Sequence, residues 1–283
     1  MAPLQRHDQR ASGSAARVRG IRRAMGFTTA IVTGSESGIG RATAVALAQR
    51  GLDVGVTWLE DEDGADATAR EVRDAGRRAE VAQLDVSRPA QAMRAVGRLA
   101  DALGGVDVFV NCAASGHSSS VLDVTPQEWR AVLDTDLTGA FFVAQEAARR
   151  MVAAGRGGRI VNVTSIHEHV PLDGAVAYCA AKHGLGAVTK CLALELAGHG
   201  ITVNSVAPGE IATPMTGHED ADPRTLERPA IPLRRPGDAR EIAAAIAHLA
   251  SPEASYTTGA SLVVDGGLLL TAAIANQGAL QGV

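Results

Sequence analysis

Aromatic residues, cysteine and long apolar runs are all scarce in this sequence. Only 3% of the 283 residues are aromatic, and the three cysteines, Cys112, Cys179 and Cys191, are widely spaced. Scattered thiols without a Cys-x-x-Cys pair argue against a disulfide framework and indicate a reducing compartment, the cytoplasm. No apolar run reaches about 18 residues, so neither a membrane-spanning helix nor a membrane partner is expected. With 46% hydrophobic residues the chain is too apolar to be disordered, and its core must consist mainly of Ala, Val, Leu and Ile.

Charge is distributed unevenly along the chain. Residues 1–26 contain six arginines and one aspartate, whereas the other 257 residues carry 21 basic and 30 acidic side chains. The acidic globular part argues against nucleic acid as a partner. The basic segment lacks the apolar stretch of a secretory signal, and we interpret it as a disordered extension. A chain starting at Met25 would keep every expected element, so residues 1–24 are predicted to be dispensable.

Short β-branched runs alternate with helical patterns from residue 29 onwards. Strands are expected at 29–33, 53–58, 79–85, 106–111, 158–164, 202–207 and 261–264. Helices are expected at 38–50, 64–76, 89–103, 126–153, 175–198 and 238–250. Strands separated by helix-length segments form parallel βαβ units. We therefore predict one α/β domain over residues 27–270, with a doubly wound Rossmann-type parallel sheet of about seven strands, and a C-terminal tail at 271–283.

One long segment interrupts this alternation. Residues 210–235 contain four prolines and several acidic residues, and follow an expected strand late in the chain. Long irregular segments in a compact domain are usually functional lids or disordered inserts. The position of this one favours a lid over a ligand cleft.

A glycine-rich turn follows the first expected strand and opens the next helix. Its sequence, Thr33-Gly34-Ser35-Glu36-Ser37-Gly38-Ile39-Gly40, has the spacing Gly-x-x-x-Gly-x-Gly. Glycines allow a sharp turn and let a diphosphate approach the backbone, where the helix N-terminus offers unpaired N–H groups. The strand before the turn and the helix after it favour dinucleotide binding over a turn without ligand.

With this spacing the sequence resembles the short-chain dehydrogenase/reductase family, over residues 29–267. Further motifs follow in the family's order: Asp85-Val86, Asn111-Cys112-Ala113-Ala114 where the family usually has Asn-Asn-Ala-Gly, Pro208-Gly209, and Thr213. Within the family, the stretch Ser165-Ile166-His167-Glu168 resembles bacterial glucose 1-dehydrogenase-like and acetoin (diacetyl) reductase-like members. The resemblance and the strand ends together assign nicotinamide cofactor binding to Gly34, Ser37, Gly38, Ile39, Gly40, Trp58, Glu60, Asp85, Val86, Asn111, Ala113, Tyr178, Lys182, Pro208, Gly209, Ile211 and Thr213.

Three residues have the order and spacing of the family's catalytic group. Ser165 precedes Tyr178 by thirteen residues, and Lys182 follows Tyr178 by four, on the same helix face. A free tyrosine has a pKa of about 10, and a nearby ammonium lowers that pKa toward the range of an efficient base. The resemblance implies that Tyr178 is the acid/base, that Lys182 also contacts the nicotinamide ribose, and that Ser165 donates to the substrate oxygen.

The fourth catalytic position departs from the family. The family usually has an asparagine that positions a relay water, and this chain has Asp136. We expect Asp136 to be catalytic and to keep the relay, although it could instead pair with Lys182 and weaken the effect of its charge. The alternative is a helix-surface acid with a relay through water alone. A variant Asp136→Asn with severalfold higher turnover and an unchanged pH dependence would contradict the first interpretation.

Acidic residues near the second expected strand favour NAD(H). Glu60 follows the strand that ends near Trp58, and no basic residue lies in the glycine-rich turn, so a 2′-phosphate would be repelled. Trp58 itself cannot bind ribose hydroxyls, whereas Glu60 could if its loop folds back. Arg41 could reach a 2′-phosphate from the start of the helix, so NADP(H) stays open.

Four residues are candidates for the substrate pocket: His117, Glu168, His169 and Met215. A solvated loop is the alternative for Glu168 and His169. The pair His167 and His169 suggests zinc, but no third ligand has matching spacing, so no metal is expected. These residues indicate a small polar alcohol, ketone or sugar as the small-molecule substrate more than a steroid.

The sequence thus predicts an NAD(P)-dependent oxidoreductase that interconverts a secondary alcohol and a ketone or aldehyde by hydride transfer. The alternative is a non-catalytic nicotinamide-dinucleotide-binding sensor or scaffold on the same fold. A pure binder needs no tyrosine at position 178, which favours the enzyme. The long apolar helices predict a homotetramer, as is common in the family.

Overall fold

The computed structural model describes residues 26–116, 119–218 and 222–271. Most of the expected N-terminal extension and C-terminal tail therefore lies outside the described residues, as does His117. Within the described ranges, no helix is long and apolar enough to cross a bilayer.

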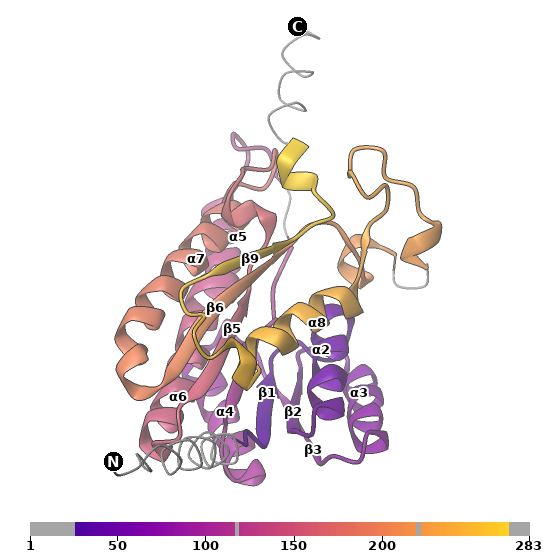
Figure 1. Ribbon diagram of the computed structural model, residues 1–283. Coiled ribbons are helices and arrows are strands. Elements are labelled where there is room, and N and C mark those ends of the chain that lie inside the picture. Colours follow the sequence, from indigo (N-terminus) through magenta and orange to yellow (C-terminus); the bar gives the residue numbers. More distant parts are fainter. Residues whose placement is uncertain (1–25, 117–118, 219–221, 272–283) are drawn as a thin grey trace, which may run out of the picture.

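The centre of the molecule is a parallel sheet of seven strands in the order β3-β2-β1-β4-β5-β6-β9 (Figure 1). The strands are β1 (Thr29–Val32), β2 (Asp53–Trp58), β3 (Ala79–Gln83), β4 (Val108–Asn111), β5 (Gly158–Val163), β6 (Ile201–Pro208) and β9 (Ser261–Val264). Strands β1, β4, β5 and β6 are buried along their whole length, as expected for apolar strands covered on both faces. The predicted doubly wound α/β sheet is confirmed.

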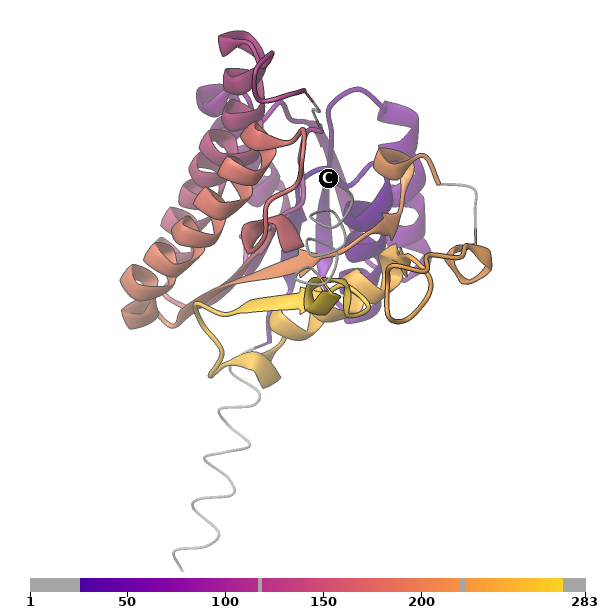
Figure 2. The same ribbon diagram turned by 90° about the horizontal axis from the view of Figure 1, so that it is seen from above.

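Two layers of helices cover the sheet, as the view from above shows (Figure 2). One layer contains α2 (Gly38–Gln49), α3 (Glu62–Asp74) and α8 (Ala239–Leu249). The other contains α4 (Pro89–Leu103), α5 (Pro126–Leu133), α6 (Ala140–Ala154) and α7 (Val176–Leu196). Each layer buries its own apolar core against the sheet, and aliphatic residues make up nearly all of both cores.

The expected helix at 126–153 is not continuous. It ends as α5 at Leu133, passes through a π-helical turn at Asp134–Gly139 and resumes as α6 at Ala140. The backbone at Gly139 lies against the carbonyl of Val86, so closely that a Cβ atom would clash with it. The π turn buries Asp136, whose side chain a regular helix would place elsewhere.

The segment expected to be a lid lies beyond the carboxyl ends of the strands, above α8 in Figure 1. It begins with β7 (Ile211–Ala212), which pairs with β8 (Gly237–Asp238), and with a 3-10 turn at Pro214–Thr216. An ion pair between Glu210 Oε1 and Arg228 Nε, 2.5 Å apart, connects the beginning of this segment to its later part.

The start of α8 offers a test of acid stability. Glu241 Oε1 and Oε2 lie 2.7 and 2.9 Å from the Arg235 guanidinium, and Oε2 accepts from the Asp238 backbone N–H. These bonds lower the pKa of Glu241 to about 2. A carboxyl with a depressed pKa stabilises the fold above its ordinary value of about 4.5 and loses this effect as the pH falls. Glu241→Gln is expected to cost about 1 kcal/mol at pH 7, and the difference should disappear toward pH 2.

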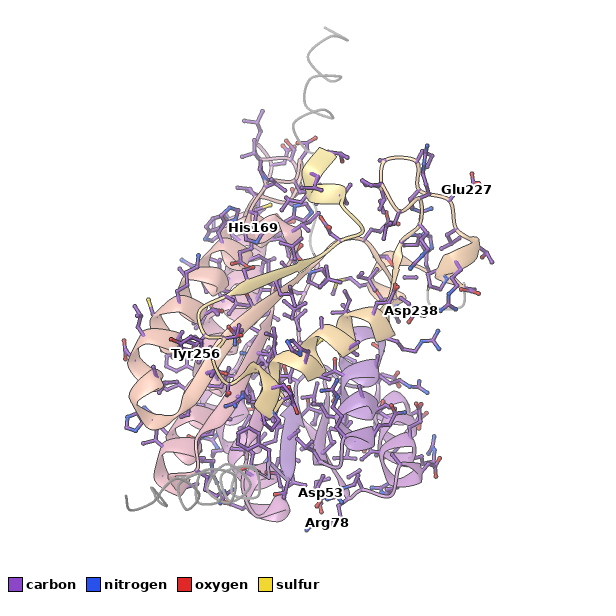
Figure 3. All side chains as sticks on the ribbon, in the orientation of Figure 1. Asp53, Arg78, His169, Glu227, Asp238 and Tyr256 are labelled. Atoms are coloured by element: carbon purple, nitrogen blue, oxygen red, sulfur yellow. The ribbon has the colours of Figure 1, made fainter. Side chains whose placement is uncertain are left out.

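Urea denaturation of both proteins across this pH range measures the effect. The exposed Glu227, labelled in Figure 3, supplies the matched control Glu227→Gln. A cost for Glu241→Gln that stays constant from pH 7 to pH 2 would contradict the assignment.

Candidate active site

One cavity opens at the carboxyl ends of the central strands, where the strand order reverses between β1 and β4. This position is where doubly wound folds bind their ligands. Most of the residues predicted for the cofactor lie around this cavity: Gly34, Ser37, Gly38, Ile39, Gly40, Trp58, Asp85, Val86, Ala113, Tyr178, Lys182, Pro208, Gly209, Ile211 and Thr213.

The glycine-rich turn forms one wall of the cavity with its backbone. Gly34 and Gly38 have φ angles of 62° and 52°, in the left-handed region that glycine tolerates. A Cβ atom on Gly34 would lie 2.8 Å from the Ala113 Cα. The Thr33 hydroxyl holds the neighbouring loop by accepting from the N–H groups of Cys112 and Ala113, at 2.9 and 3.1 Å. A bare backbone beside a helix N-terminus fits a dinucleotide diphosphate.

Two predicted cofactor residues lie outside this cavity. The Asn111 amide is buried and donates to the Ala140 carbonyl at 2.8 Å and to Asn162 Oδ1 at 2.9 Å. Its side chain therefore fastens β4 to α6 and β5 and does not line the cavity. Glu60 is exposed in the turn before α3 and does not line the cavity, because the loop does not fold back.

Arg41, the residue that left NADP(H) open, also lies outside the main cavity. Its guanidinium pairs with Glu71 on α3, with Nε at 2.9 Å from Oε1. A different residue, Glu36, lines the cavity, and its Oε1 accepts from the Leu59 N–H at 3.3 Å. Its location in the turn was visible in the sequence, but only the fold shows that its side chain reaches the end of β2.

Ser165, Tyr178 and Lys182 meet at the other end of the cavity. Ser165 directly follows β5 and Thr164, and its Oγ accepts from the His167 N–H at 3.2 Å. This bond leaves the hydroxyl hydrogen of Ser165 for donation. Tyr178 and Lys182 lie one turn apart on α7, with Lys182 Nζ 5.3 Å from the centre of the Tyr178 ring. The arrangement joins a hydroxyl acid/base, a cation and a hydrogen-bond donor in one cavity.

Asp136 forms a buried ion pair with Lys182. Its Oδ2 lies 3.1 Å from Nζ, and the two side chains are 0% and 2% exposed. Its Oδ1 accepts from the N–H and the hydroxyl of Ser115, at 2.7 and 2.8 Å. Burial lowers the pKa of Lys182, but the charges of Asp136 and Tyr178 outweigh it, and the pKa lies above its ordinary value. The interpretation as a helix-surface acid was wrong, because the π turn directs this side chain inward.

Cys112 also borders the cavity, and its chemistry is that of a packing residue. Burial raises the pKa of this thiol to about 12, Lys182 partly opposes the shift and Glu36 adds to it. At pH 8 we expect iodoacetamide to label Cys112 about 10³-fold more slowly than a free cysteine, because the thiolate is the reacting form.

Mass spectrometry of the peptide that contains Cys112 measures this rate. The rate should rise about tenfold per pH unit between pH 8 and 10, and the urea-unfolded chain serves as the control. Labelling of the folded protein at the rate of the unfolded chain would show that the thiol is not held protonated.

The predicted substrate residues separate into two places. Met215 lines the cavity from the lid segment. Glu168 does not: it is buried, and its Oε2 accepts from Thr164, Ser205 and Ser261 hydroxyls at 2.7, 3.3 and 3.0 Å. Glu168 therefore neither lines the cavity nor faces solvent, because its carboxylate is bonded to residues of β6 and β9.

His169 is exposed at the start of the loop that precedes α7, and its Nε2 lies 3.1 Å from Ser261 Oγ (Figure 3). It is not among the cavity residues. Within the described parts of the chain, no group of three or more His, Cys, Asp or Glu side chains could hold a metal ion.

The fold and the cavity define a nicotinamide-dependent oxidoreductase, and comparisons agree. Residues 33–269 match the family model described as enoyl-(acyl carrier protein) reductase. The chain belongs to the short-chain dehydrogenase/reductase family. The homologous enzymes give no support to a non-catalytic binder.

Individual relatives are similar over nearly their whole length. The uncharacterized oxidoreductase YohF of Escherichia coli is 52% identical, over 85% of this chain and 95% of that protein. The crystal structure of acetoin dehydrogenase YohF from Salmonella typhimurium has a TM-score of 0.83 and 51% identity, over 86% of this chain and 96% of that one. The 3beta-hydroxysteroid dehydrogenase 1 of Eggerthella lenta is 40% identical, over 86% of this chain and 94% of that protein.

Proposed function

We propose that this enzyme interconverts a small polar secondary alcohol and its ketone, in the manner of acetoin and diacetyl, with NAD(H) as its preferred cofactor. The observation that carries the proposal is the meeting of Ser165, Tyr178 and Lys182 in the cavity that the glycine-rich turn borders. The acetoin dehydrogenase YohF of Salmonella typhimurium is 51% identical to this chain. That similarity supports a vicinal hydroxyketone or diketone as the substrate class.

Each catalytic side chain has one task in this proposal. The bound nicotinamide dinucleotide supplies or accepts the hydride. The Tyr178 hydroxyl gives a proton to the substrate oxygen during ketone reduction and takes it back during alcohol oxidation. The Ser165 hydroxyl donates a hydrogen bond to the same oxygen as its charge develops. Lys182 stabilises the phenolate form of Tyr178 by its positive charge.

Asp136 keeps Lys182 charged and in place in this proposal. The pair satisfies the lysine inside the protein, where an isolated ammonium would be costly. Its carboxylate takes the position of the family's usual asparagine and can accept the same hydrogen bonds. We assign it the relay role on this ground.

The substrate class can be tested with purified enzyme and a panel of ketones. We expect the highest kcat/KM for diacetyl and acetoin, lower values for glucose and polyols, and the lowest for 3β-hydroxysteroids. A preference for the steroids would overturn the substrate class, while leaving the reaction class intact. Cofactor binding without turnover of any panel member would favour the sensor.

The outer faces of α6 and α7 support a homotetramer. Phe141, Val152, Val188 and Leu192 line a largely apolar groove between these helices, and a second copy of the chain would cover it. Light scattering after size exclusion measures the mass, and a monomer at working concentration would contradict the assignment.

The remaining proposals concern the rest of the chain. We assign residues 1–24 no role in catalysis. We assign the enzyme to the cytoplasm, because its cysteines are few and scattered. Deletion of residues 1–24 should leave kcat and KM unchanged, and mass spectrometry of the native protein would show whether translation starts at Met1 or Met25.

A further inference from the structure

Glu36 lies in the middle of the glycine-rich turn and faces the cavity. One carboxylate oxygen, Oε1, accepts from the Leu59 N–H at 3.3 Å. The other, Oε2, is buried, and no described residue donates to it. A buried carboxylate oxygen without a donor is costly unless a ligand or water supplies one.

The end of β2 is the place where this fold recognises the adenosine ribose. An Asp or Glu at that place hydrogen-bonds the 2′-hydroxyl of NAD, whereas an arginine accommodates the 2′-phosphate of NADP. In this chain the strand ends at Trp58, which has no carboxylate, and Glu60 is exposed and does not line the cavity. The bond from Leu59 to Glu36 brings a carboxylate to the same place from the neighbouring turn.

The cationic side chains considered for a 2′-phosphate at the end of β2 already have other roles or partners. Among the described residues that line the cavity, Lys182 is the only cation, and it belongs to the catalytic end. Arg41, the nearest arginine along the chain, is paired with Glu71. A 2′-phosphate would therefore meet an unneutralised carboxylate without a free partner of opposite charge.

We propose that Glu36 selects NAD(H) over NADP(H) by accepting a hydrogen bond from the adenosine ribose 2′-hydroxyl at its carboxylate. The carboxylate that selects the cofactor thus comes from the phosphate-binding turn and not from the end of β2. This inference rests on the proposed preference for NAD(H) and names the residue that produces it.

The test measures Kd values for NADH and NADPH by nucleotide fluorescence, without any substrate. Glu36→Gln should weaken NADH and strengthen NADPH, so that the ratio of the two Kd values changes by about tenfold or more. Glu62→Gln is the matched control, because Glu62 is an exposed carboxylate at the start of α3. Thermal melting verifies that each variant is folded.

A second measurement changes the ligand as well as the protein. Removing the 2′-hydroxyl from the ligand, as 2′-deoxy-NADH, should weaken binding about tenfold in the wild type and much less in Glu36→Gln. Equal losses in both proteins, or a ratio that responds to Glu60→Gln and not to Glu36→Gln, would overturn the inference.

The two proposals fail in different ways. A wild-type protein that prefers NADPH contradicts the proposed cofactor preference. A wild-type protein that prefers NADH, with a ratio unchanged in Glu36→Gln, leaves that preference standing and removes Glu36 as its cause.

Discussion

Replacing Tyr178 with phenylalanine is expected to lower kcat by about 10²–10⁴-fold, the range that general acid–base catalysis contributes. The variant loses the hydroxyl to which the proposed mechanism assigns proton exchange with the substrate oxygen, and the Ser165 hydroxyl is assigned only hydrogen-bond donation. The ring that borders the cavity stays, so the Kd for NADH should change less than threefold. Steady-state kinetics with diacetyl and a fluorescence titration separate the two quantities.

The chain contains a matched control for this experiment. Its only other tyrosine, Tyr256, labelled in Figure 3, is fully exposed and does not line the cavity. Tyr256→Phe removes the same hydroxyl and should leave kcat unchanged. If Tyr178→Phe retained more than a tenth of the wild-type kcat, Tyr178 would not be the acid/base.

Replacing Lys182 with methionine is expected to destabilise the fold by about 3–5 kcal/mol, because it leaves the buried Asp136 without its counter-ion. The variant should also lose at least 10²-fold in kcat, since the charge that favours the phenolate is gone. A lysine with a raised pKa stabilises the fold at neutral pH and loses this effect as the pH rises through that pKa. The stability difference should therefore shrink above about pH 10.5.

Urea denaturation at several pH values and kinetics on the folded fraction measure both effects. Lys190→Met, an exposed position on the same helix, is the control. A loss of activity with unchanged stability would show that the pair with Asp136 contributes nothing to folding.

Asp136→Asn probes the same pair from its other side. The amide can still accept a hydrogen bond, so the loss of stability should be smaller than in Lys182→Met. With the negative charge removed, burial leaves less of Lys182 charged, so the phenolate is stabilised less and the pH at which alcohol oxidation is half-maximal should rise. The exposed Asp134→Asn is the control, and severalfold higher turnover with an unchanged pH profile would reject the relay role.

Much of the fold follows from local patterns in the sequence. Unbroken apolar runs such as Ala30-Ile31-Val32 are typical of strands covered on both faces, and β1 has that environment. The glycine-rich turn can be predicted from the sequence because its backbone conformation favours glycine at Gly34 and Gly38. These features depend on neighbours in sequence, so the expected sheet and turn match the structure within one or two residues at most ends.

Features that depend on contacts between residues far apart in the sequence could not be predicted from local patterns. The π turn within 126–153 includes Gly139, which packs against Val86, 53 positions earlier in the chain. Glu168 looks like a pocket residue beside Ser165, but its surroundings come from β6 and β9, much later in the chain. Glu36 reaches the end of β2 only because the fold places β1 beside it.

The reversal of strand order between β1 and β4 divides the enzyme into two working halves. Strands β1 to β3 and their turns carry Glu36 and Trp58, while β4, β5 and α7 carry the groups that face the substrate. The sheet joins the two halves at the seam where β1 pairs with β4, and the hydrogen bonds of Glu36 and Asp136 lie on opposite sides of it, to Leu59 and to Ser115. Free-energy changes from substitutions on opposite sides of this seam should simply add, so cofactor choice and catalytic pH dependence can change independently of each other.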